Sequence, residues 1–259
     1  MSIRVAVAGA TGKLGSVAVR LIRDADDLDL VAELTSRSSL DEMGEADVLV
    51  DMTLPHVSPG IVAFAIDHGI NVVVGTSGWS DERIRDLSAR VAAHEGTGAL
   101  VIPNFSLGSA LGTAFATLAG RFFDSIEIVE AHSASKLDSP SGTAVRTAEL
   151  IDAARGDRGP VIAPHTDQRA RGQQVASIPV HSLRMEGLVA QQQVFFGGVG
   201  ETLTIRHDTL DSRAYESGIL LAVRAAVSMT GVRVGLESLI DLGISTVHSD
   251  SIVDVPRER

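Results

Sequence analysis

The chain has 259 residues, of which 44% are hydrophobic and 21% are charged, and this composition predicts an ordinary globular protein with one large or two smaller domains. It contains no cysteine, which excludes disulfides, thiolate metal sites and thiol catalysis, and we predict no metal site. The formal net charge of −11 argues against a broad surface for nucleic acid or an anionic membrane, although it permits a local basic pocket for an anionic ligand.

The N-terminal residues run directly into an apolar strand pattern, without the basic and apolar regions of a secretory signal. No uncharged apolar run approaches the roughly 20 residues that span a bilayer. We therefore expect a cytoplasmic protein that binds neither membrane nor nucleic acid.

Apolar runs and helical patterns alternate along the first hundred residues. A first helix follows Lys13, and further helices are predicted near Pro59–His68 and over Ser80–His94, where "SDER" is a capping pattern. The predicted strands are Ile3–Gly9, Leu28–Leu34, Ala46–Thr53, Ile70–Thr76 and Gly98–Asn104. Strands that alternate with helices form a parallel sheet with right-handed crossovers. The expected fold class is therefore α/β, with a doubly wound, Rossmann-type nucleotide domain.

The pattern changes after about residue 110. The predicted elements are a helix over Ala110–Phe123, a strand over Ser125–His132, a helix over Ser141–Arg155, a long exposed loop over Gly156–Gln174, three strands over Ser177–Met185, Leu188–Gly197 and Glu201–Leu210, and a helix over Ser217–Met229. Successive strands indicate a second, α+β domain built on an open mixed sheet. An open sheet has edges or a face to cover, and pairing with another subunit is one way to cover it.

The segment "GATGKLG" places three glycines just after the first strand and at the start of a helix. Such a turn allows close backbone approach, and the free N–H groups of the helix bind a pyrophosphate. The predicted cofactor contacts here are Gly9, Ala10, Thr11, Gly12, Lys13, Leu14 and Gly15. The alternative is a tight turn without a ligand and a solvated lysine. A lysine at the positive end of a helix is unfavourable, however, and an anionic ligand would offset that cost.

The end of the second strand bears on the choice of cofactor. An acidic residue there typically holds the ribose of NAD, but the terminal positions are Thr35, Ser36 and Arg37. These donors suit a 2′-phosphate, so we predict NADPH, while Glu33 within the strand leaves NADH as an alternative. A solvated loop explains Ser36 and Arg37 nearly as well.

The stretch "EAHSASKLDSPSGTA" contains Lys136, one of only two lysines beside twenty arginines. Ser141, Gly142 and Thr143 open the next helix, whose hydroxyl and N–H groups suit a carboxylate. His132 and Lys136, facing that point, could protonate the product of a hydride addition. A histidine alone is as well explained by a half-buried structural role. A lysine where the chain elsewhere uses arginine indicates a compact ammonium that can deliver a proton.

With these motifs, nearly the whole chain resembles the 4-hydroxy-tetrahydrodipicolinate reductase family, also called dihydrodipicolinate reductase. The resemblance rests on "VAGATGKLG", "VDMTLP", "VVGTSGW", "IPNFSLG", "GETLTIRHD", "GLESLIDL" and above all "K-x-D-x-P-S-G-T-A". It implies an NAD(P)H-dependent reductase of lysine and diaminopimelate biosynthesis that acts on a carboxylated cyclic substrate.

By this resemblance His132 is the catalytic histidine and Lys136 is the proton donor. Ser133, Ser141, Gly142 and Thr143 are the expected substrate contacts. Two loops are expected beneath the nicotinamide, formed by Gly75, Thr76 and Ser77 and by Ile102, Pro103, Asn104 and Phe105. The resemblance also implies a homotetramer. Residues 1–108, completed by 218–259, are expected to bind the dinucleotide, and residues 109–217 the substrate and the other subunits.

The chain departs from the family pattern at positions where many members have histidine. Ser133 follows the catalytic histidine, Ser135 precedes the lysine, and Gln191 lies in a later strand. Serine cannot be cationic, and a charged donor to a carboxylate contributes about 1.5–3 kcal/mol. Two alternatives follow: a paralogous reductase of a related cyclic imine or carboxylated substrate, and a non-catalytic NADP-binding regulator, against which the retained His132 and Lys136 argue.

Overall fold

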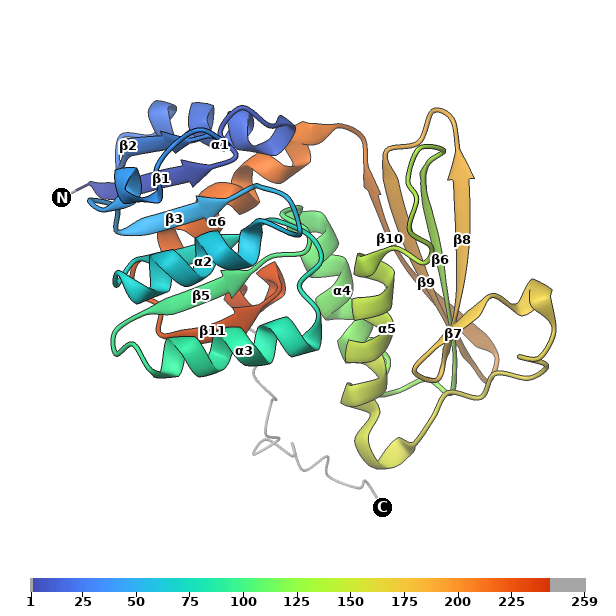
Figure 1. Cartoon of the computed structure of the whole chain (residues 1–259). Coiled ribbons are helices and arrows are strands. Elements are labelled where there is room, and N and C mark those ends of the chain that lie inside the picture. The colour runs from blue at the N-terminus through green and yellow to red at the C-terminus, as the bar shows by residue number, and fades with distance from the viewer. Residues whose placement is uncertain (1, 243–259) are drawn as a thin grey trace, which may run out of the picture.

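The alternating strands and helices form one parallel sheet in the computed structural model, which describes residues 2–242. Its strands are β1 (Ile3–Ala8), β2 (Leu28–Leu34), β3 (Val48–Asp51), β4 (Asn71–Val74), β5 (Gly98–Val101) and β11 (Gly231–Val234). They lie in the order β11-β5-β4-β3-β1-β2, and every pair is parallel (Figure 1). The predicted doubly wound fold is confirmed.

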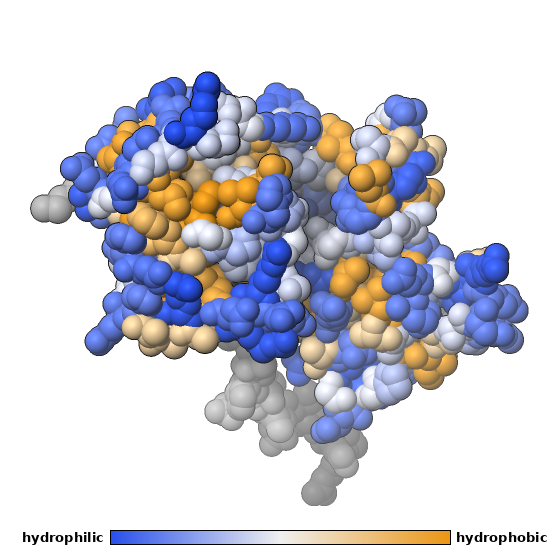
Figure 2. All heavy atoms as spheres, viewed as in Figure 1, coloured by the Kyte–Doolittle hydropathy of each residue, from blue (hydrophilic) through white to orange (hydrophobic). Residues whose placement is uncertain are grey.

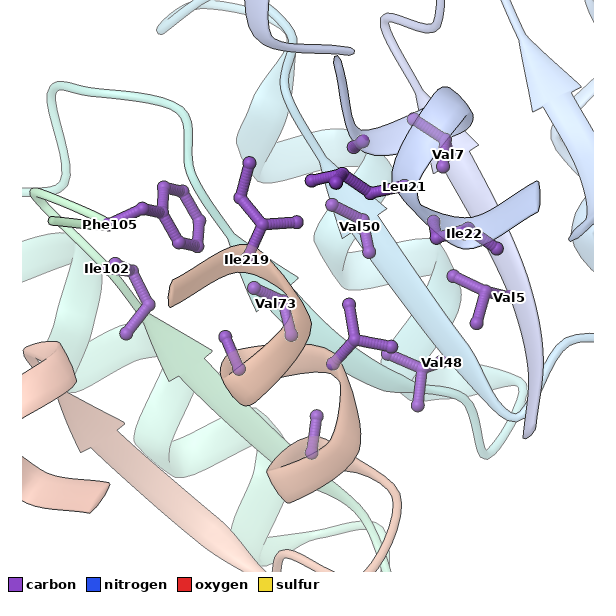
Figure 3. Packing of buried hydrophobic residues seen from close by; sticks show 14 of the residues in the cluster. Val5, Val7, Leu21, Ile22, Val48, Val50, Val73, Ile102, Phe105 and Ile219 are labelled. Carbon is purple, nitrogen blue, oxygen red and sulfur yellow. The ribbon is translucent and has the colours of Figure 1, made fainter. Parts of the chain in front are cut away.

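Helices cover both faces of this sheet, because the buried strands have apolar side chains on both sides. The helices are α1 (Lys13–Asp24), α2 (Ser58–Asp67), α3 (Asp81–Ala92) and α6 (Glu216–Ala226). On the face of α1 and α6, Val5 and Val7 pack with Leu21, Ile22 and Ile219 (Figure 3). The opposite face packs against α2 and α3. β1, β3, β4 and β5 end one to three residues earlier than predicted, where the chain turns into loops.

A second, five-stranded sheet follows, in the order β10-β9-β6-β8-β7. Its strands are β6 (Ser125–Ser133), β7 (Gln173–Val175), β8 (Ile178–Met185), β9 (Ala190–Gly198) and β10 (Glu201–Thr209). β6 and β8 are parallel and the other pairs are antiparallel, so the sheet is mixed, as predicted. Helices α4 (Leu107–Ala119) and α5 (Gly142–Arg155) pack on one face over the core of Ile126, Ile128 and Phe196.

Other predicted boundaries were also wrong, among them the end of the helix expected over Ser217–Met229, which is α6 and ends at Ala226. The helix expected over Ala110–Phe123 begins at Leu107, because the Ser106 hydroxyl caps it by accepting the Ser109 N–H, and it ends before Gly120. The expected loop over residues 156–174 contains two 3₁₀ turns and the first residues of β7. The remaining 3₁₀ turns are Leu40–Met43, Ser212–Tyr215 and Leu236–Leu239.

The last strand was not predicted as an element of its own. β11 follows α6 and pairs with β5, so the chain returns from the second sheet to complete the first. Residues 243–259, which belong to the segment expected to complete the nucleotide domain, lie outside the described residues. Among the residues that the structure describes, no helix combines the length and the apolar composition needed to cross a membrane.

Candidate active site

A cleft of about 1010 Å³ lies between the two sheets, and both contribute residues to its walls. The space-filling view shows a recess between the N-terminal part of the chain and the part built on β6–β10 (Figure 2). Predicted site residues that line the cleft are Lys13, Leu14, Gly75, Thr76, Ser77, Pro103, Asn104, Phe105, His132, Lys136, Ser141, Gly142 and Thr143. Those outside its lining are Gly9, Ala10, Thr11, Gly12, Gly15, Thr35, Ser36, Arg37, Ile102 and Ser133. A smaller cavity of about 620 Å³ lies between α2 and α3.

The turn between β1 and α1 has the geometry that a dinucleotide needs. Gly9 has a φ of +78°, and a Cβ there would lie 2.4 Å from the Met52 carbonyl oxygen. A Cβ on Gly15 would lie 2.0 Å from the Gly9 carbonyl oxygen, so strand and helix approach as closely as glycine permits. Gly12 is the N-cap residue of α1, and no side chain within residues 2–242 caps the helix. The N–H groups of the first helical turn therefore remain for a phosphate, and the residues fit the cofactor.

At the end of β2, the acidic residue and the predicted donors have different surroundings. The carboxylate of Glu33 forms an ion pair with Arg23. The Thr35 hydroxyl accepts a hydrogen bond from the Arg37 N–H at 3.3 Å, and the Thr35 N–H donates to the Ser38 hydroxyl at 3.2 Å. The side chain of Arg37 is exposed, and within the described chain its guanidinium has no ion pair. A cation at this strand end is thus available to an anionic ligand.

A buried aspartate that the sequence reasoning did not assign holds the loop after β3. Asp51 is fully buried and accepts hydrogen bonds from the hydroxyls of Thr53 and Ser58, both at 2.5 Å. The Thr53 N–H also donates to the Thr76 hydroxyl at 2.8 Å, which joins this loop to the one after β4. The Gly75 N–H donates to the Asp51 carbonyl oxygen. The loop after β3 therefore holds the loop after β4, which lines the cleft.

Glu130 and His132 lie on the same face of β6, because residues two apart in a strand point to the same side. Glu130 is fully buried, and its Oε2 lies 2.6 Å from Nδ1 of His132. Burial by itself raises the pKa of Glu130, but hydrogen bonds from His132, Arg184 and Ser182 outweigh it and lower the pKa to about 2. Glu130 is therefore a carboxylate at neutral pH and can only accept hydrogen bonds.

Arg184, on the neighbouring strand β8, holds both oxygens of that carboxylate. Its Nη1 donates to Oε2 of Glu130 at 2.9 Å, and its Nη2 donates to Oε1 at 2.8 Å. The same Nη2 donates to the carbonyl oxygen of Asp138 at 2.6 Å. The loop that carries Lys136 is thus tied to the buried carboxylate. Arg184 was not predicted as a site residue.

Lys136 and the start of α5 complete this side of the cleft. The Lys136 ammonium lies 2.8 Å from the Asp138 carboxylate. The hydroxyl of Ser141 caps α5 by accepting the Ala144 N–H at 3.3 Å, as predicted for this turn. Gly142 and Thr143 are the first residues of the helix and line the cleft. Helix start, imidazole and ammonium therefore face one space.

Two of the unusual positions lie on the other face of the second sheet. Ser133 follows His132 directly, so it points to the opposite side, and its hydroxyl lies 2.9 Å from the hydroxyl of Ser135. Gln191 pairs with Ala131 across β9 and β6 and shares that opposite face. Neither residue lines the cleft. The expected contact of Ser133 with substrate stays a prediction.

Arg146 was also missed by the sequence reasoning, although it follows the motif by only a few residues. It lines the cleft from α5 and donates to Glu237 beyond β11 and to the Val234 carbonyl oxygen. No local pattern marks it, since its partners lie about ninety residues away in sequence.

Solved structures of other proteins share this architecture. A scyllo-inositol dehydrogenase from Lactobacillus casei, 12% identical, matches with a TM-score of 0.62 over 92% of each chain, which shows the shared fold alone. A dipicolinate-bound dihydrodipicolinate reductase from Paenisporosarcina sp. TG-14, 31% identical, matches with a TM-score of 0.80 over 93% of this chain and 100% of the other.

Sequence comparison makes the assignment specific. Residues 3–105 match the family model described as dihydrodipicolinate reductase, N-terminus, and residues 107–242 match its C-terminus. A 4-hydroxy-tetrahydrodipicolinate reductase from Clavibacter sepedonicus is 62% identical over 93% of this chain and 87% of its own length. The corresponding protein of Streptomyces griseus is 46% identical over 93% and 98%. The chain belongs to the dihydrodipicolinate reductase family.

Proposed function

We propose that the protein is an NAD(P)H-dependent reductase that converts 4-hydroxy-tetrahydrodipicolinate to tetrahydrodipicolinate in lysine and diaminopimelate biosynthesis. The observation that carries this proposal is the single cleft in which Lys13 and the loops after β4 and β5 face His132, Lys136 and the start of α5. The names of the relatives support the substrate, and the bound dipicolinate of the solved neighbour supports a carboxylated ring. We further propose that the protein acts in the cytoplasm.

The cofactor side of the cleft is assigned to the first sheet. The α1 N-terminus and Lys13 bind the phosphates, and Arg37 favours NADPH over NADH. A reduced nicotinamide, when bound, supplies the hydride. The residues that would hold the nicotinamide ring are Gly75, Thr76, Ser77, Pro103, Asn104 and Phe105, which line this side of the cleft.

The substrate side is assigned to the second sheet. The N–H groups of Gly142 and Thr143 and the Thr143 hydroxyl bind one carboxylate of the substrate at the positive end of α5. The ring hydroxyl of the substrate leaves with a neighbouring hydrogen as water, and the hydride and one proton add to the double bond that this elimination forms. The Lys136 ammonium delivers that proton, and His132 adds a second polar group beside the reacting atoms. Ser141 supports this arrangement as the cap of the helix.

The domain division follows the two sheets. Residues 1–108, completed by the segment from 218 onward, bind the dinucleotide, and residues 109–217 bind the substrate. The face of the second sheet opposite α4 and α5 joins subunits into a homotetramer. Phe195, Leu183 and Met185 lie on that face by strand register and are 39%, 40% and 52% exposed.

The alternative of a paralogous substrate rested on Ser133, Ser135 and Gln191. The proposed catalytic pair, His132 and Lys136, lines the cleft, whereas Ser133 and Gln191 do not. Nothing else favours the alternative or a non-catalytic regulator.

The test is NADPH oxidation with the cyclic substrate, formed from its precursors immediately before use. The native protein is expected to consume NADPH only when the substrate is present. Lys136→Ala serves as the control for contaminating reductases and is expected to lose at least about a hundredfold in turnover. Absence of turnover in the native protein, with NADPH bound, would refute the proposal.

A further inference from the structure

Glu130 is a buried carboxylate with no place in the proposed chemistry, and it does not line the cleft. Groups from four other positions converge on it: Nδ1 of His132, both Nη atoms of Arg184, the N–H of Ser141 at 3.2 Å, and Ser182. His132 and Ser141 line the cleft, and Arg184 holds the loop of Lys136, which also lines it. A carboxylate that touches all of them is placed to set their relative positions.

The contact with His132 fixes the proton on one ring nitrogen. An ionised carboxylate has no hydrogen to donate, so Nδ1 must carry the proton in a 2.6 Å contact. The second ring nitrogen, Nε2, is then the one that faces the cleft, which His132 lines while Glu130 does not. The orientation of the imidazole is thereby determined by a residue behind it.

Arg184 extends the same constraint to the lysine loop. Its Nη2 donates both to Glu130 and to the Asp138 carbonyl oxygen, two residues beyond Lys136. Asp138 in turn forms the ion pair with the Lys136 ammonium. The Glu130 carboxylate therefore contacts His132 through Oε2 and, through Oε1 and Arg184, holds the loop that carries Lys136.

We propose that Glu130 and Arg184 are positioning residues, which hold His132 with its proton on Nδ1 and fix the loop of Lys136 for proton delivery. This inference rests on the proposed reductase function. A buried ion pair can also be purely structural, and the two roles predict different outcomes for the same variants.

Glu130→Gln preserves shape while removing the charge. An amide oxygen at the Oε1 position keeps the hydrogen bonds from Nη2 of Arg184 and the Ser141 N–H. The NH₂ group then faces Nδ1 of His132, which requires the ring proton to move to Nε2, and Nη1 of Arg184 loses this acceptor. The corresponding Asp→Asn change in a Ser-His-Asp triad lowers kcat by about 10⁴. We expect at least about a tenfold loss of kcat, with the Kd for NADPH unchanged.

A matched control lies on the same strand. Glu127 on β6 also contacts a histidine and an arginine, His181 at 2.8 Å and Arg171, but on the face away from the cleft. Glu127→Gln is expected to keep kcat within about twofold, compared at equal subunit concentration. Equal losses in the two variants would overturn the proposal.

The double variant Glu130→Gln with Arg184→Met separates positioning from stability. Replacing both members of a buried ion pair by neutral groups commonly restores the stability that a single replacement loses. Positioning predicts that the melting temperature recovers relative to Arg184→Met alone while kcat stays at least about tenfold below native. Recovery of kcat in step with the melting temperature would show a structural role and overturn the proposal.

The ring proton can be observed without any substrate. Nitrogen-15 shifts of the histidine rings, recorded at about pH 8.5, where an ordinary histidine is neutral, report the tautomer, and His132→Gln identifies the signal. Native protein is expected to show Nδ1–H, and Glu130→Gln to show Nε2–H. This pattern supports the positioning role even if the native protein fails to reduce the cyclic substrate. An active native enzyme whose His132 tautomer is the same in both proteins would overturn the positioning role alone.

Discussion

Arg146 on α5 and Glu237 beyond β11 form an ion pair across the cleft, with Nη2 of the arginine 2.6 Å and its Nε 2.9 Å from the same carboxylate oxygen. The arginine also donates to the Val234 carbonyl oxygen at 2.8 Å. The two side chains are only 27% and 17% exposed. This pair links α5, whose N-terminus is the proposed substrate contact, to the segment after β11 in the first sheet, which carries the proposed nucleotide turn.

We predict that Arg146→Met weakens this link and raises the KM values for both NADPH and substrate by roughly three- to tenfold, or about 0.7–1.4 kcal/mol. The reason is that the ion pair between Arg146 and Glu237 no longer stabilises the arrangement in which both sides of the cleft contact the ligands. Steady-state kinetics with each ligand varied in turn measure the effect. Arg224→Met is the control, since its pair with Asp27 is exposed and such pairs contribute little. A KM increase as large in the control would contradict the role of the link.

The second prediction concerns the cofactor preference. Arg37→Ala removes the exposed guanidinium at the end of β2, and we expect it to weaken NADPH binding by about tenfold or more while NADH binding changes little, because only NADPH has a 2′-phosphate. Calorimetric titrations with each cofactor measure this. Arg85→Ala removes the same charge from an exposed position on α3 outside the cleft lining and should leave both affinities unchanged. Tighter binding of NADH than NADPH by the native protein would overturn the assignment.

The limits of the sequence reasoning follow from how far apart partners lie along the chain. β-Branched runs that end in glycine or polar residues are local patterns, and they predicted the parallel sheet and the turn that carries Lys13. The short spacing of His132, Lys136 and Ser141 likewise predicted one side of the cleft. Arg184 lies 54 residues from Glu130, however, and only the pairing of β6 with β8 brings them together.

β11 shows the same limit for a whole strand. Its four residues alternate between exposed and half-buried positions, so no apolar run marks it, and its pairing with β5 is entirely long-range. A sequence motif does not show which face of a strand a residue occupies, and this matters for the positions that differ from the family pattern. The register then placed Ser133 and Gln191 on the face opposite His132, which a motif cannot reveal.

The third prediction concerns assembly. Phe195 lies on the open face of the second sheet, and Phe195→Glu places a charge there, so we expect the proposed tetramer to dissociate into smaller species. Light scattering at micromolar concentration measures the mass. Val57→Glu, at an exposed apolar residue before α2, should remain tetrameric. A monomeric native protein would contradict the proposed role of the sheet.

The fourth prediction concerns acid stability. The pKa of Glu130 falls from 4.5 to about 2 on folding, so its contribution is fully present above about pH 4.5 and is lost as the pH falls toward 2. The shift corresponds to about 3 kcal/mol. The difference in unfolding free energy between native protein and Glu130→Gln should therefore be largest near neutral pH and shrink below pH 4.5. Urea titrations across this pH range measure the two unfolding free energies. A difference between them that did not change with pH would contradict the prediction.

The last prediction explains why a chain with twenty arginines keeps lysine at two positions. Lys136→Arg retains the positive charge, but a guanidinium is bulkier and holds its proton with a pKa above about 12. We expect turnover to fall by at least about a hundredfold, since positioned proton transfer typically contributes that much, while NADPH binds with near-native affinity. Lys13→Arg is the matched control, because that ammonium faces the nucleotide side of the same cleft. It should weaken NADPH binding modestly and leave the chemical step, measured in single turnovers, nearly intact. Native turnover by Lys136→Arg would show that Lys136 is not the proton donor and that its ammonium serves only as a charge.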